Sequence, residues 1–219
     1  SVQDGDVRHF GMSKEGTVAR QFMLGVVQTA DGMPIYHEVF DGNTSEAPTL
    51  LPTVRKVLAR YPHIRRLVMV ADRGLLSVDN LADLSAISLP DGQANLEPAQ
   101  IVQRYKSLAD IERGFRVLKS EIEIAPVYHR LPERIRAHAS ICFMALILYR
   151  VMRQRLKAAG HSASPESALA QLRKIQRQSV AINQGVPVSG ISNIHREQAD
   201  LLAAMNIRKP VPDAQLSLL

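Results

Sequence analysis

The sequence predicts an α/β protein whose strands lie in the first half of the chain and whose second half is mostly helical. Two β-prone runs and one short apolar run, of the kind typical of a buried strand, lie before residue 72. Residues 88–97 (SLPDGQANLE) are turn-rich and show no periodicity. From Pro98 onward, apolar residues recur at helical spacing.

The first two strands are predicted at residues 21–28 and 34–40. Both runs, QFMLGVVQ and PIYHEVF, are β-prone, and the turn-forming pair Asp31-Gly32 lies between them. This pattern is typical of an antiparallel hairpin with a slightly long loop.

An amphipathic helix is predicted between residues 46 and 61. Its apolar residues recur at helical spacing, and the pair Tyr61-Pro62 ends the pattern. The residues expected on its apolar face are Leu50, Leu51, Val54, Val57 and Leu58.

The short apolar run at residues 67–71 predicts a strand that is buried on both faces. Asp72 follows it directly and is therefore expected at the carboxyl end of a central strand. Ser77 can cap a following helix that runs to about Ile87.

The second half of the chain predicts four helices. One surrounds Glu112 from about residue 105, one spans residues 134–157, one begins after the N-cap Ser164, and one lies within residues 194–207. The helix at 134–157 is apolar nearly all round its middle, which predicts burial between other elements. It contains Cys142, the single cysteine, which excludes a disulfide within the chain and is expected in the core.

Composition and charge indicate a cytoplasmic protein with a polyanionic partner. The longest apolar run, residues 139–149, is too short to span a bilayer, so no membrane contact is expected. Residues 1–100 carry 9 Lys and Arg against 12 Asp and Glu, whereas residues 101–219 carry 18 against 9. A basic second half favours nucleic acid as the partner, and a set of solvated helix faces is the alternative.

A possible catalytic arrangement lies on the helix around Glu112. Tyr105, Glu112 and Lys119 are seven residues apart, so their side chains form one stripe with about 10 Å between neighbours. Arg113 and Arg116 flank this stripe. A carboxylate of this kind can hold a divalent metal while cations bind phosphates, although a charged stripe is also typical of a solvated helix face. Asp72 is a second candidate ligand, since open α/β sheets place metal ligands at strand ends, but it also suits a simple turn.

Three ordered blocks of the chain resemble the DDE-type insertion-sequence transposases that carry a Tyr, Arg, Glu, Lys signature. The blocks are NTSEAPTLLP, then VADRGLLS, then RYKSLADIERGFRVLKSEIEI with PVYHRLPERIRAH. Tyr105, Glu112 and Lys119 match the spacing of the signature, while its Arg position falls on Leu108. The resemblance extends from about Gly11 to the end of the chain.

The resemblance implies a ribonuclease H-like mixed sheet, incomplete here, in which residues 1–125 form part of a catalytic core. Residues 126–219 would form a helical region that packs on it. The implied reaction is metal-dependent phosphodiester cleavage and strand transfer at transposon ends. The implied partners are double-stranded DNA, both transposon ends and target, and further copies of the chain on that DNA. The implied location is the nucleoid of a bacterial cytoplasm.

The resemblance also implies roles for single residues. Asp72 and Glu112 would be the second and third acids of the triad and would bind Mg²⁺ or Mn²⁺. Tyr105 and Lys119 would contact the end DNA. Arg113 and Arg116 would contact phosphates.

Two departures from the family pattern leave other functions open. The first acid of the triad is expected upstream of the segment HFGMSKEG, where Asp4 and Asp6 are in no β-prone run, so we expect both in an exposed loop and neither in catalysis. The connection from Asp72 to Glu112, 40 residues, is shorter than the family's. With one acid absent, at least one metal would be poorly held. The alternatives to an active transposase are therefore a non-catalytic DNA-binding or multimerising remnant and a metal-dependent nuclease that never joins strands.

Overall fold

The computed structural model describes residues 6–12, 18–29, 31–65, 67, 78–87, 99, 102, 108–180 and 188–211. It is a mixed α/β structure, as the sequence predicts. The chain divides into two compact units, Ser1–Leu146 and Ile147–Leu219.

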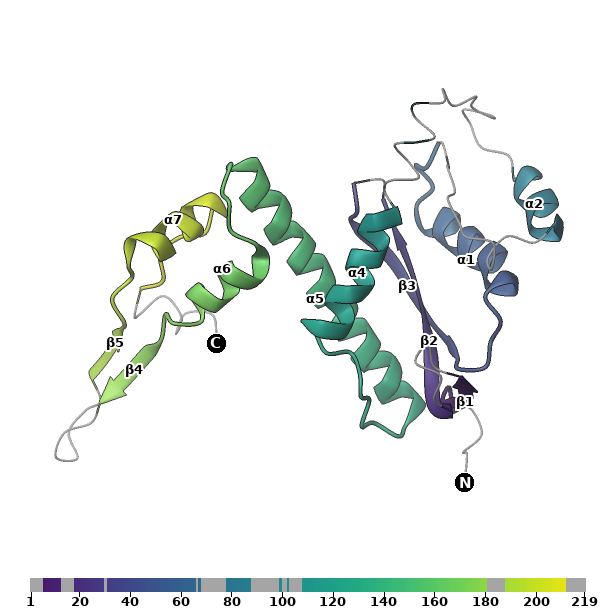
Figure 1. Cartoon of the computed structure of the whole chain (residues 1–219), viewed down its shortest axis with the longest axis horizontal. Coiled ribbons are helices and arrows are strands. Elements are labelled where there is room, and N and C mark those ends of the chain that lie inside the picture. The colour runs from purple at the N-terminus through teal and green to yellow at the C-terminus, as the bar shows by residue number, and fades with distance from the viewer. Residues whose placement is uncertain are drawn as a thin grey trace. The chain divides into compact units, whose positions relative to one another are not determined.

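The first unit contains a three-stranded antiparallel sheet in the order β1-β2-β3 (Figure 1). The strands are β1 (His9–Met12), β2 (Val18–Gln28) and β3 (Pro34–Asp41). The predicted hairpin is confirmed: β2 pairs with β3 from Phe22 opposite Asp41 to Gln28 opposite Pro34. Gly32 has a φ of 82° in the connecting turn, a conformation that favours glycine. Strand β1 was not predicted, because its four residues are too few to show alternation.

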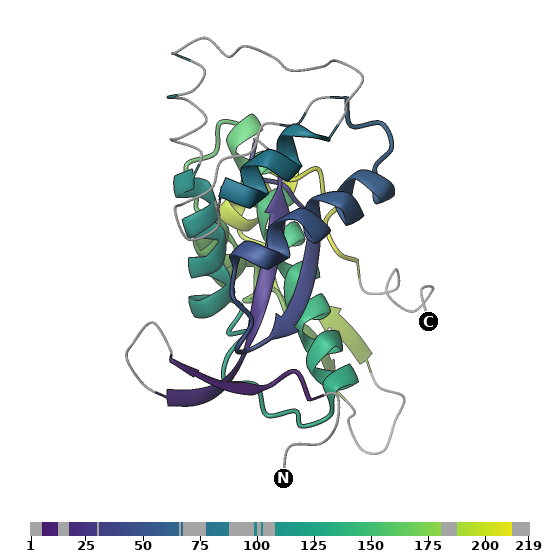
Figure 2. The same cartoon turned by 90° about the vertical axis from the view of Figure 1, so that its right-hand side faces the viewer.

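Helices cover both faces of β3 (Figures 1 and 2). On one side lies α1 (Ala47–Arg60), confirmed as predicted, where Lys56 pairs with Glu38. On the other side lies α5 (Pro132–Ala158), where the ring of Phe143 stacks on His37 with 4.4 Å between ring centroids. Successive residues of a strand point to opposite faces of the sheet, so Glu38 contacts α1 while His37 contacts α5.

Two more helices belong to the first unit. They are α2 (Val78–Ser85) and α4 (Leu108–Ser120), and both fall where helices are predicted. Helix α4 buries Val117 and Leu118. Of the strand predicted at residues 67–71, only Leu67 lies within the described residues.

Helix α5 begins in the first unit and ends in the second. It buries Ala139, Cys142 and Leu146, which confirms the core position of the cysteine. Ile141, Met144 and Leu148 are exposed, so the predicted burial between other elements holds for only one side of the helix. With 27 residues, α5 is the one helix in the described ranges long and apolar enough to cross a membrane, a test that core helices of soluble proteins also pass.

The second unit packs the end of α5 against two helices, α6 (Pro165–Leu172) and α7 (Arg196–Ala204). Leu156, Ala168, Leu201 and Met205 form its core. The predicted cap at the start of α6 is confirmed, because the Ser164 side chain accepts a hydrogen bond from the backbone N–H of Ser167.

An antiparallel hairpin lies between α6 and α7. It consists of β4 (Arg177–Val180) and β5 (Val188–Ile191). The sequence did not predict it, because RQSV and VSGI show no clear alternation of apolar and polar residues.

Candidate nucleic-acid interface and catalytic residues

Helix α4 presents a charged face that contains four of the six predicted site residues. Glu112, Arg113, Arg116 and Lys119 are all exposed, whereas Leu118 on the opposite side is buried. Glu112 and Lys119 are two helical turns apart and therefore share a face, with about 10 Å of helix rise between them. The pattern of apolar residues anchors α4 and leaves both charges of this pair accessible to a ligand.

The other two predicted site residues, Asp72 and Tyr105, lie outside the described residues. Of the two carboxylates predicted to bind metal, only Glu112 therefore lies among the described residues. Across the ranges that the structure describes, no three His, Cys, Asp or Glu side chains come together as a metal site.

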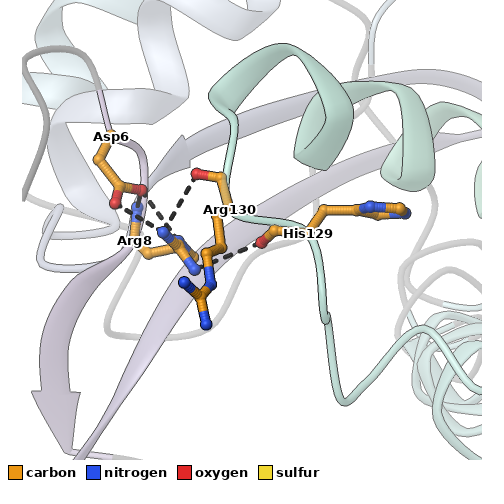
Figure 3. A network of polar contacts seen from close by, with 4 residues as sticks. All are labelled: Asp6, Arg8, His129 and Arg130. Atoms are coloured by element: carbon orange, nitrogen blue, oxygen red, sulfur yellow. Dashed lines mark hydrogen bonds and ion pairs between the residues drawn. The ribbon is translucent and has the colours of Figure 1, made fainter.

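Asp6 is buried, so its predicted place in an exposed loop is wrong, and Asp4 lies outside the described residues. The Asp6 side chain is 3% exposed and receives three hydrogen bonds from Arg8 (Figure 3). Its Oδ1 accepts from the backbone N–H and from Nε of Arg8, at 2.9 and 3.0 Å. Its Oδ2 accepts from Nη2 of Arg8 at 2.9 Å.

The Arg8 guanidinium also holds a distant segment of the chain. Its Nη1 donates to the carbonyl oxygen of His129 at 3.3 Å, and its Nη2 donates to that of Arg130 at 3.1 Å (Figure 3). The sequence carries a weak signal for the ion pair, an acid and an arginine two residues apart. It carries no signal for the two carbonyl acceptors, which is why the burial was missed.

The hydrogen bonds from the Arg8 side chain, followed by that from its backbone, lower the pKa of Asp6 from 3.8 to about 2. Both carboxylate oxygens accept hydrogen bonds from Arg8, so the Asp6 side chain has a structural role. Asp6 is therefore a poor candidate for the first acid of a catalytic triad, although it is not the exposed loop residue that the sequence predicts.

The low pKa of Asp6 predicts acid-sensitive stability. The carboxylate binds its proton less tightly in the folded than in the unfolded protein, so the ion pair stabilises the fold above about pH 4, and this stabilisation is lost between about pH 4 and pH 2. The shift corresponds to about 2 kcal/mol. Urea unfolding at several pH values, compared with Asp6→Asn, measures it. We expect a smaller loss of stability on acidification in the variant, and equal losses would contradict the assignment.

The comparisons with known proteins give no family for this chain. No protein-family model, no curated protein and no solved structure matches it. The resemblance to transposases therefore stays a prediction from the sequence.

Proposed function

We propose that the protein acts on double-stranded DNA as a DDE-type transposase with an incomplete ribonuclease H-like core. The observation that carries this proposal is the exposed face of α4, where Glu112 and Lys119 share one side of a helix that lies within the block resembling the transposase signature. Arg113 and Arg116 are exposed on the same helix. A duplex can reach a carboxylate and three cations together there.

The proposed roles follow from the chemistry of phosphoryl transfer. Glu112, with Asp72, would hold Mg²⁺ or Mn²⁺, and the metal would supply the charge that stabilises a phosphodiester under attack. Lys119, with Tyr105, would hold the transposon end. Arg113 and Arg116 would bind phosphate oxygens. Further copies of the chain on the same DNA would bring two ends together, at the nucleoid of a bacterial cytoplasm.

Metal-dependent cleavage of a labelled duplex that carries the element's own ends tests the catalytic proposal. We expect cleavage by the wild-type chain, and its loss in Asp72→Ala and in Glu112→Ala, because each removes a metal ligand. Glu121→Ala is the matched control, since this exposed acid follows directly after α4 and has no proposed role. Cleavage that survives Glu112→Ala, or that is lost equally in the control, would contradict the proposal.

A second function, a non-catalytic DNA-binding or multimerising remnant of a transposase, is favoured by the environment of Asp6. Asp6, which precedes β1, accepts three hydrogen bonds from Arg8, and this leaves its carboxylate little capacity to bind a metal. Binding of the duplex without cleavage would support this function. A strand-transfer assay on paired ends would distinguish transposition from plain nuclease activity.

A further inference from the structure

The net positive charge of the chain belongs to the second unit. Residues 147–219 carry 10 Lys and Arg against 4 Asp and Glu, whereas residues 1–146 carry 17 of each. The formal net charge of the whole chain is +6, so the second unit accounts for all of it. Charge of this kind on one compact unit attracts a polyanion.

Three exposed cations lie within five consecutive residues where α6 leads into the β4–β5 hairpin. They are Arg173, Lys174 and Arg177. Lys174 donates to the neutral side chain of Gln171 at 2.9 Å, and within the described ranges no ion pair involves any of the three. Their charges are therefore available to an external anion.

The hairpin displays polar groups suited to phosphate oxygens. Ser179 lies opposite Ser189, and Nη2 of Arg177 donates to the Ser189 hydroxyl at 3.5 Å. The Ser189 hydroxyl in turn donates to that of Ser179 at 3.4 Å, so one face of the hairpin carries a guanidinium and two hydroxyls. On the other face, a Cβ added to Gly190 would meet nothing within 4 Å. The backbone of β5 at Gly190 is therefore accessible to a ligand.

The base of the hairpin is held firmly by hydrogen bonds. The backbone N–H of Ser192 donates to the Gln176 carbonyl at 2.9 Å, and the N–H of Gln176 donates to the Ser192 hydroxyl at 3.0 Å. The buried side chain of Gln198 on α7 donates to the carbonyl oxygen of Gln171 on α6 at 3.0 Å. A ribbon fixed in this way loses little conformational entropy when it binds.

We infer that strands β4 and β5, with Arg173, Lys174 and Arg177, form a second DNA-binding surface. This surface binds the phosphate backbone of a duplex. Arginine, lysine and hydroxyl side chains are usual hydrogen-bond donors to the phosphate oxygens of DNA. This surface belongs to the second unit and the α4 face to the first. The inference rests on the proposed function only for the identity of the partner.

Fluorescence anisotropy of the full chain with a labelled 30-base-pair duplex of arbitrary sequence, over a series of salt concentrations, tests the inference. In the variant Arg173→Ala/Lys174→Ala/Arg177→Ala we expect affinity to fall roughly tenfold or more. The slope of log affinity against log salt should fall by about 2 to 3, since each lost phosphate contact contributes about 0.9. All three side chains are exposed, so the variant should keep the wild-type circular dichroism spectrum.

The matched control removes three other exposed arginines, Arg55, Arg60 and Arg134, all from the first unit. We expect its salt slope to change by less than about 1. An equal fall in the control would show a mere effect of net charge, and an unchanged slope in the hairpin variant would exclude contact there; either overturns the inference.

Two outcomes separate this inference from the proposed function. DNA binding that is lost in Lys119→Ala but unchanged in the hairpin variant overturns the inference alone. Wild-type chain that binds anionic phospholipid vesicles but no DNA overturns both.

Discussion

Replacing Gly42 by alanine is expected to lower the free energy of unfolding by about 3 kcal/mol or more. A Cβ at this position would lie 1.8 Å from the backbone carbonyl oxygen of Gln21 and 3.1 Å from that of His9. Backbone atoms of paired strands cannot move aside cheaply, because moving them breaks the sheet. Gly42 also donates its N–H to the Val7 carbonyl at 3.0 Å, so the clash would pull the segment before β1 away from the sheet.

Chemical denaturation followed by circular dichroism measures this effect. Gly190→Ala is the matched control, since its added methyl group would meet nothing within 4 Å, and we expect it to change stability by less than about 0.5 kcal/mol. If Gly42→Ala were as stable as this control, the close approach of β2 to the end of β3 would be wrong.

Replacing Arg8 by alanine is expected to lower the free energy of unfolding by about 3 to 5 kcal/mol. The change removes the partner of the buried Asp6 carboxylate and leaves its charge uncompensated. It also removes the donors to the carbonyl oxygens of His129 and Arg130. The first of these effects should dominate, because an unpaired buried charge costs more than a lost neutral hydrogen bond.

The double variant Asp6→Ala/Arg8→Ala separates these two effects. It has no buried charge, so we expect it to be more stable than Arg8→Ala alone although it has lost one more side chain. The deficit of Arg8→Ala should also shrink as the pH falls toward about 4, because protonation of Asp6 then removes the unpaired charge. A double variant less stable than the single one would mean that the Asp6 charge is not the source of the cost.

The elements with long periodic patterns could be predicted from the sequence. The hairpin of β2 and β3, helix α1 and helix α5 each contain enough apolar residues at regular spacing to identify the element. Strands β1, β4 and β5 have four residues each, and hydrogen bonds made by other segments fix them. The hydrogen bonds between Ser192 and Gln176 at the base of the β4–β5 hairpin are an example of such contacts. No local sequence pattern predicts them.

Only the part of the candidate site that lies on a single helix could be predicted from the sequence. Helical geometry alone places Glu112 and Lys119 on one face, and both are exposed on α4. The environment of Asp6 depends on residues 129 and 130, more than 120 positions away, so its burial could not be read from its neighbours. The sequence places the cations of the hairpin region in the basic half of the chain, but no pattern in it predicts a hairpin beside them.

The hydrogen bonds from Arg8 to the carbonyl oxygens of His129 and Arg130 also determine when the surroundings of Arg8 can form during synthesis. These hydrogen bonds join residues 121 and 122 positions apart. At about 5 to 20 residues per second, the ribosome adds the acceptor segment roughly 6 to 25 seconds after Arg8 itself. For that time the nascent chain can form the local pair with Asp6 but cannot complete the anchor. Asp6 and Arg8 thus reach their final environment only after residues 129 and 130 have been added.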